Sequence, residues 1–201
     1  FRHIEIKNGL VYVNGEKVLF KGANLQDTHP VTGRSVDVAT MLTDVKMMKQ
    51  ANMNTVRTSH YPQPTEWYDL CDEYGIYVLD EANVESHGMG YGATTLAKDP
   101  QFESAHIERT RRMVKRDFNH PSIIVWSLGN EAGNGPNFFK TYELVKSMDT
   151  SRPVQYERAQ LDANTDIFCP MYHNYNDVLR YVSANPARPL IQCEYAHAMG
   201  N

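Results

Sequence analysis

The chain has 201 residues, of which 41% are apolar and 22% are charged, and its formal charge at neutral pH is −4. A chain of this length buries a substantial core, and these proportions exclude a disordered tail, a collagenous repeat and a coiled-coil rod. The slight acidic excess predicts no nucleic-acid partner, and the lack of any run near the roughly 20 apolar residues of a membrane span predicts no membrane contact.

The chain ends and the cysteines say little about the compartment. The first residues, Phe1-Arg2-His3, include no initiator methionine and no apolar signal-peptide segment, so we expect an internal start. Cys71, Cys169 and Cys193 have neither the number nor the spacing of a disulfide framework or a zinc site. We expect three buried thiols, which suit a cytoplasmic enzyme and leave the periplasm open.

The first 17 residues predict a short β lead-in from a preceding domain, because Asn8-Gly9 and Asn14-Gly15 are typical of tight turns between strands. From residue 18 onward, short apolar strands alternate with helices. Hydrophobic periodicity predicts helices over 38–48, after an N-cap at Asp37, and over 64–74, 103–118, 137–148 and 175–183. Strands are expected at 18–24, 55–59, 77–83, 123–128, 154–158, 166–172 and 190–195.

Alternating short strands and helices indicate a parallel sheet, either doubly wound or closed into a barrel. The turn after the first barrel strand, residues 24–30, lacks the glycines of a phosphate-binding loop. Polar side chains follow nearly every strand, as in a barrel, which collects residues from all its strand ends on one face. They include Asn24, Arg57, His60, Asp80, Glu81, Glu131, Glu157, Arg158, Tyr172 and Glu194.

We therefore predict an α/β fold, specifically an incomplete (β/α)8 TIM barrel with about seven strands. The barrel domain is expected to occupy residues 18–201, after the lead-in at 1–17. Since a whole TIM barrel takes about 250 residues, its C-terminal strand and helices are expected to be missing.

Two glutamates at strand ends carry the clearest chemical signal. Glu131 and Glu194 each follow an apolar strand, where a carboxylate is costly unless it is paired or hydrogen-bonded. Either each one forms an ion pair with Arg57 or Arg158, or the two face each other across a sugar-sized cleft as the carboxylate pair of a glycosidase. Because both glutamates stand at strand ends, we favour the second interpretation.

Five segments, which together span nearly the whole chain, resemble the catalytic barrel of family 2 glycoside hydrolases, in particular the large bacterial β-galactosidases. They are RTSHYP (57–62), DEANVESHG (80–88), RDFNHPS (116–122), WSLGNE (126–131) and CEYAHAMGN (193–201). The last segment is similar to the β-galactosidase branch rather than to the β-glucuronidase or β-mannosidase branches.

The resemblance implies a retaining mechanism and roles for single residues. Glu131 matches the general acid/base and Glu194 the nucleophile, which forms a glycosyl ester while the acid protonates the leaving oxygen. Arg57 matches a cation that keeps the nucleophile ionised. The sugar-binding positions are matched by Asn130, which hydrogen-bonds the 2-OH, by Tyr172 beside the nucleophile, and by His60 and His197, which contact galactose.

The resemblance also implies a magnesium ion held by Glu85, His87 and Glu131, and no organic cofactor. Carboxylate oxygens suit Mg²⁺, although a histidine ligand is less usual for it. Gln26 departs from the family, because it stands where a substrate-contacting histidine is expected. A glutamine hydrogen-bonds a hydroxyl but never becomes cationic, which leaves the fine substrate preference open.

We expect a retaining exo-glycosidase that hydrolyses terminal β-D-galactosides, with a β-galactoside or a related oligosaccharide as partner and a homo-oligomeric full-length protein. The alternatives are a family relative that acts on a β-glucuronide or β-mannoside, and a non-catalytic carbohydrate-binding fragment. A β-glucuronidase requires an additional cation for the sugar carboxylate. The isolated 201 residues are expected to have little activity, because the eighth strand that closes the site is absent.

Overall fold

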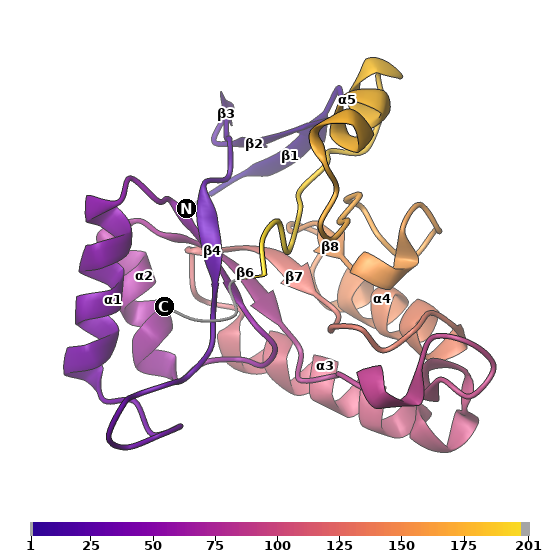
Figure 1. Ribbon diagram of the computed structural model, residues 1–201, viewed down its shortest axis with the longest axis horizontal. Helices are drawn as coiled ribbons and strands as arrows, with labels where there is room; N and C mark the ends of the chain where they lie inside the picture. The colour runs from indigo at the N-terminus through magenta and orange to yellow at the C-terminus, as the bar shows by residue number, and fades with distance from the viewer. Residues whose placement is uncertain (1, 198–201) are drawn as a thin grey trace.

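The computed structural model describes residues 2–197, so the last four residues of the CEYAHAMGN segment lie outside the described part. The chain forms two sheets (Figure 1). The small antiparallel sheet contains β1 (Ile4–Lys7), β2 (Leu10–Val13) and β3 (Glu16–Lys17). The larger parallel sheet contains β4 (Gly22–Leu25), β5 (Thr55–Thr58), β6 (Tyr77–Glu81), β7 (Ile123–Ser127) and β8 (Val154–Gln155).

The strands of the parallel sheet neighbour one another in chain order, with one long helix between each pair. These helices are α1 (Val38–Gln50), α2 (Thr65–Tyr74), α3 (Glu103–Asp117) and α4 (Pro136–Met148), and α5 (Tyr175–Ser183) follows β8. Single 3₁₀ turns cover His87–Met89, Leu96–Lys98, Pro100–Phe102 and Glu157–Ala159. A strand order that never reverses is the topology of a barrel wall, which confirms the predicted incomplete barrel over a doubly wound sheet.

The sixth and seventh expected strands are present only as bridged segments. Single parallel bridges join Gln155 to Ile167, Phe168 to Leu190, and Met171 to Glu194, so both segments continue the sheet order without forming a full ladder. Across the remaining opening, the Tyr195 hydroxyl donates to the Gly22 carbonyl of β4 at 3.1 Å. The wall therefore curves far enough for its last segment to reach its first strand.

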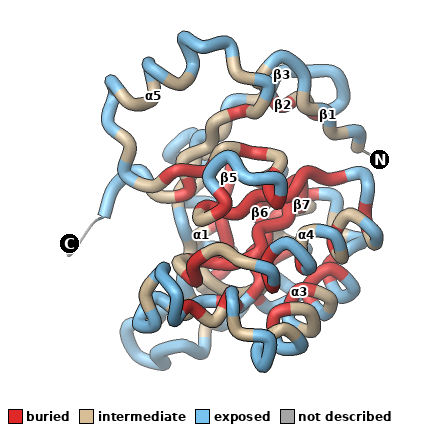
Figure 2. The backbone as a smooth tube through the Cα atoms, turned by 90° about the vertical axis from the view of Figure 1, so that its right-hand side faces the viewer, coloured by how far each residue is buried: buried red, intermediate tan, exposed pale blue. Residues whose placement is uncertain are grey.

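The lead-in folds as its turns predict. Asn8, Gly9, Asn14 and Gly15 all have positive φ, the conformation of the tight turns that suit hairpins. The resulting β1–β3 sheet lies at the same end of the molecule as α5 in both views (Figures 1 and 2). Its assignment to a preceding domain stays a prediction.

The core lies between the parallel sheet and α1–α4, and Figure 2 shows the buried chain concentrated in β5–β7. Successive residues of a strand point to opposite faces. In β6, Val78 packs into the helix-side core, whereas Leu79 joins a second cluster on the inner face with Val125 and Cys193. The inner face therefore carries apolar side chains along the strands and polar side chains where the strands end. Within residues 2–197, every helix is too short or too polar to cross a bilayer.

A buried guanidinium connects the N-terminal ends of β7 and β8. Arg152 forms an ion pair with Asp149, and both side chains are about 1% exposed. Its remaining N–H groups donate to the carbonyls of Ile123 and Phe118, and its guanidinium lies 4.8 Å from the centre of the Trp126 ring. Trp126 is fully buried in this contact, so it fills the core and offers no platform to a sugar.

We predict that Arg152→Ala lowers the free energy of unfolding of the barrel by about 3–5 kcal/mol, because it leaves the Asp149 carboxylate buried without its cation. Urea unfolding of the full-length protein, followed by fluorescence, measures the change. Arg112→Ala, at an exposed arginine of α3, is the control and should change stability by about 0.5 kcal/mol or less. Equal midpoints for the two variants would contradict the anchoring role of Arg152.

Candidate active site

Arg57, on the inner face of β5, is the centre of the polar network at the strand ends. Its Nε lies 2.7 Å from Glu81 Oε2, and one terminal nitrogen donates to Asn130 Oδ1 at 2.7 Å. The other terminal nitrogen lies 3.3 Å from Glu194 Oε1. Because Arg57 is itself buried, these anionic and polar partners are what make its charge tolerable.

Glu81 is the fixed partner of Arg57. It is fully buried on β6, and it also accepts hydrogen bonds from the Ser127 hydroxyl at 2.6 Å and from His60 Nδ1 at 2.9 Å. Burial alone would raise the pKa of Glu81, but the Arg57 guanidinium and the hydrogen bond from His60 hold that pKa below its usual value. Glu81 therefore stays ionised and holds Arg57 and His60 in place.

Glu194 has a separate partner for each carboxylate oxygen. Arg57 contacts Oε1, and the Tyr172 hydroxyl donates to Oε2. His60 Nε2 lies 3.9 Å from the same Oε1. Partial burial, the hydrogen bond to Glu194, and the negative charges of Glu194 and Glu131 all raise the pKa of Tyr172. The Tyr172 hydroxyl is thus close enough to both predicted catalytic carboxylates for their charges to act on it.

A constrained loop after β7 presents Asn130 and Glu131. Gly129 has φ +152°, and a Cβ at that position would lie 2.4 Å from the Val84 carbonyl oxygen, so only glycine fits. Glu131 has φ +43°, and its N–H donates to Glu157 Oε1 at 2.7 Å. Apart from four asparagines, the non-glycine residues with positive φ in the described part are Glu131, Gln160 and Tyr172. Backbone strain is therefore stored at two of the predicted site residues.

The Glu131 carboxylate is held from several sides. Oε1 accepts from the Tyr91 hydroxyl at 2.7 Å and from Arg158 at 3.0 Å, while His87 Nδ1 lies 3.3 Å from Oε2. Burial raises the pKa of Glu157 to about 7, against the lowering effect of Arg158. Glu131 is thus oriented through its side chain and its backbone together.

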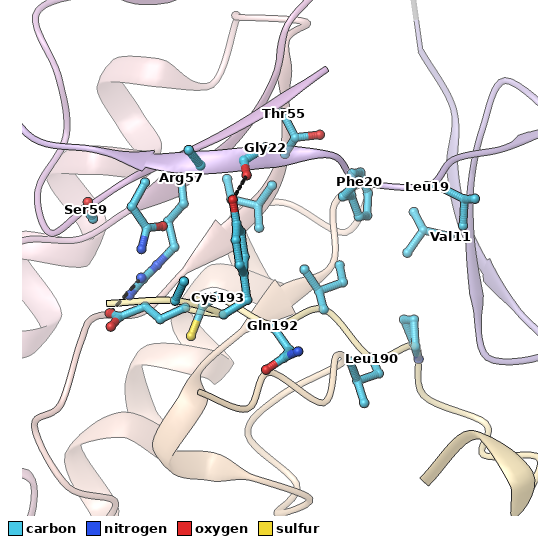
Figure 3. A pocket seen from close by; sticks show the side chains of 18 of the residues that line it. Val11, Leu19, Phe20, Gly22, Thr55, Arg57, Ser59, Leu190, Gln192 and Cys193 are labelled. Carbon is cyan, nitrogen blue, oxygen red and sulfur yellow. Dashed lines mark hydrogen bonds and ion pairs between the residues drawn. The ribbon is translucent and has the colours of Figure 1, made fainter. Parts of the chain in front are cut away.

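A cleft of about 940 Å³ opens beside Glu194, between β4 and the segment that carries Leu190, Gln192 and Cys193 (Figure 3). Six of the predicted site residues line it, namely Gln26, Arg57, His60, Tyr172, Glu194 and His197. His197 and Gln26 are exposed there, and the His197 ring lies 6.1 Å from that of Tyr172. The other predicted residues, Glu85, His87, Asn130 and Glu131, lie outside this lining and connect to it through the Arg57–Asn130 bond.

Two of the three predicted magnesium ligands meet, since His87 Nδ1 lies 3.3 Å from Glu131 Oε2, but Glu85 is turned to another partner. The Glu85 carboxylate lies 3.5 Å from the Asn130 amide nitrogen, and Oε1 of Glu131 is taken by Arg158 and Tyr91. Among residues 2–197, the three acidic or histidine ligand atoms found within 4.8 Å of one another belong to Asp69, Asp72 and His120 instead. In that trio, Asp72 is committed to His120 and to the Ser122 N–H. The three predicted ligand atoms thus do not all lie within 4.8 Å of one another, although the donor types suit the ion, and magnesium stays a prediction.

Both ion pairs weighed as the alternative to catalysis are present. Glu194 pairs with Arg57 and Glu131 with Arg158, yet the two carboxylates keep 13% and 21% of their side-chain surface exposed. The pairs therefore hold the carboxylates without sealing them off.

Three residues of the site have no role that the sequence alone predicts, namely Glu81, Tyr91 and Glu157. Glu81 and Glu157 belong to the predicted set of polar residues at strand ends, but the sequence alone does not indicate which residues they contact. Tyr91 lies in the long loop between β6 and α3, and no local pattern indicates its contact with Glu131.

Comparison with known proteins identifies the family. A family model described as "Glycosyl hydrolases family 2, TIM barrel domain" matches residues 4–201. A β-glucuronidase from Ruminococcus gnavus in complex with uronic deoxynojirimycin is 26% identical, with a TM-score of 0.80 over 96% of this chain and 38% of that chain. The same enzyme with D-glucuronic acid gives 26% identity and a TM-score of 0.81 over 96% of this chain and 37% of that one.

A further structure of the R. gnavus β-glucuronidase is 25% identical, with a TM-score of 0.81 over 94% of this chain and 38% of that chain. The chain therefore spans well under half the length of these enzymes. Because the family model leaves out only residues 1–3, the chain belongs to glycosyl hydrolase family 2 and contains its TIM barrel domain.

Proposed function

We propose that this domain is the catalytic barrel of a retaining exo-β-galactosidase, with Glu194 as nucleophile and Glu131 as general acid/base. The observation that carries the proposal is the Arg57 network. A single guanidinium contacts Glu194 and also Asn130, the residue directly before Glu131. That contact links the two carboxylates that a double displacement needs.

The first half of the reaction follows from the partners of each carboxylate. Arg57 pairs with Glu194 and, with Tyr172, fixes both of its oxygens for attack on the anomeric carbon. Glu131 gives its proton to the departing glycosidic oxygen, and Glu194 becomes a glycosyl ester. In the second half, Glu131 takes a proton from water, which attacks the ester and releases a sugar with retained configuration.

The sugar-binding groups surround the nucleophile. His60 is held by Glu81 with its other ring nitrogen directed toward Glu194, so it is placed to hydrogen-bond a hydroxyl next to the reacting carbon. His197 and Gln26 face the cleft from two different segments of the wall. The side-chain oxygen of Asn130 accepts a hydrogen bond from Arg57, so its side-chain nitrogen is the atom that can donate to the 2-OH.

The β-glucuronidase structures make a β-glucuronide the second candidate substrate. A glucuronide carries a carboxylate, whose recognition calls for a cation free to pair with it. Among the described residues that line the cleft, Arg57 is the one lysine or arginine, and Glu81, Glu194 and Asn130 already share it. This shortage of free cations supports a neutral sugar, as does the galactosidase-like CEYAHAMGN ending.

The substrate is tested by assaying the full-length protein with nitrophenyl β-galactoside, β-glucuronide and β-mannoside. We expect kcat/KM to be highest for the galactoside, by at least about tenfold, since a glucuronide carboxylate would be buried without a partner. A preference for the glucuronide would overturn the galactoside proposal and retain the glycosidase. Failure to hydrolyse all three would favour a non-catalytic carbohydrate-binding role.

The two carboxylates should respond differently to an external nucleophile. Glu131→Gln should regain activity with azide on activated aryl galactosides, because such leaving groups need no acid and azide needs no base. Its product should be the β-galactosyl azide, detected by NMR. Glu194→Gln should give no β-product, since the nucleophile itself is missing. Identical behaviour of the two variants would mean that their roles are wrongly assigned.

The 201-residue chain alone should be much less active than the full-length protein. Among residues 2–197, no strand pairs with both β4 and the segment 190–194, and the Tyr195–Gly22 hydrogen bond spans this side of the cleft. A shift of about 1 Å at a reacting group costs on the order of 100-fold in rate. Measuring kcat/KM for both forms tests this. Near-equal values would show that the partial barrel formed by these 201 residues is enough for activity.

A further inference from the structure

The predicted acid/base carboxylate is bound by a permanent cation. Arg158, just after β8, places a terminal nitrogen 3.0 Å from Glu131 Oε1, and the Tyr91 hydroxyl donates to the same oxygen. These two contacts hold one oxygen of the carboxylate, whereas Oε2 faces His87.

The position of Arg158 is fixed on two sides. Its guanidinium lies 3.6 Å from the centre of the Tyr91 ring, and His87 stacks on the same ring with planes 6° apart. Its Nε lies 3.0 Å from Glu157 Oε2, while the other oxygen of Glu157 accepts the N–H of Glu131. Arg158 and Glu157 therefore hold the side chain and the backbone of Glu131 as one unit.

We propose that Arg158 is a positioning residue for Glu131. This inference rests on the proposed function, because it concerns the acid/base of that reaction. A guanidinium stays charged over the whole working pH range, and its planar fork binds a carboxylate in a defined orientation. When Glu131 releases its proton to the glycosidic oxygen, the charge that appears on its carboxylate meets Arg158.

Two substrates whose leaving groups differ in their need for an acid test this role. In the full-length protein, Arg158→Ala should lower kcat/KM about 10- to 100-fold for methyl β-galactoside, whose departure needs a well-placed acid. For 2,4-dinitrophenyl β-galactoside, whose leaving group needs no acid, the loss should stay within about threefold. Arg158→Lys should recover part of the loss, and Arg112→Ala should match the parent. A uniform loss over both substrates would overturn the positioning role.

A measurement without substrate separates this inference from the proposed function. The drop in Tm caused by Arg158→Ala should be smaller in a Glu131→Gln background than in the parent, since the pair is already broken there. Equal drops would mean that Arg158 does not act on Glu131, whatever the enzyme hydrolyses. If the coupling is present and no glycoside is hydrolysed, the proposed function fails while the contact stands.

Discussion

The site depends on one constraint, the burial of a guanidinium at the end of β5. Arg57 is almost inaccessible to water, so the surrounding strands must supply anions and acceptors at fixed positions. Glu81 provides the permanent counter-charge, and the remaining N–H groups are then directed to Asn130 and Glu194. The order of the barrel wall makes this possible, because strands that follow one another in sequence are also neighbours in space.

The two-residue period of a strand decides which polar residues join this network. Asp80 and Glu81 are adjacent and both buried, yet they have different environments. Asp80 points toward the helices, where it accepts a hydrogen bond from the Tyr68 hydroxyl, and burial together with Asp117 raises its pKa. Glu81 points inward to Arg57, which keeps its pKa low. The same carboxylate chemistry thus serves the core on one face and the candidate site on the other.

Much of the fold was predictable from the sequence, because it follows from short-range patterns. The Asn-Gly turns, the N-cap at Asp37 and the apolar periodicity place the strands and helices within a few residues. Segments 166–172 and 190–195 have the composition of strands but form single bridges, since pairing requires a neighbour that composition does not reveal. In the site, Arg57, His60, Tyr172 and Glu194 meet around one cleft as expected, and Arg158 pairs with Glu131 as the strand-end pattern allowed. The contact of Tyr91 with Glu131 depends on loop geometry that has no local signal.

The strained backbone at Glu131 and Tyr172 shows how the two halves of the candidate site are connected. Left-handed φ at a non-glycine residue costs of order 1–3 kcal/mol, so the surrounding structure must hold it there. At Glu131 the hydrogen bond to Glu157 does so, and at Tyr172 the N–H donates to the Glu194 carbonyl at 2.7 Å. The Tyr172 hydroxyl then returns to the Glu194 side chain. Backbone and side-chain contacts therefore hold the predicted nucleophile segment against its neighbour, and Arg158 and Glu157 hold the predicted acid/base. Arg57 connects the two groups of contacts through Glu194 and Asn130.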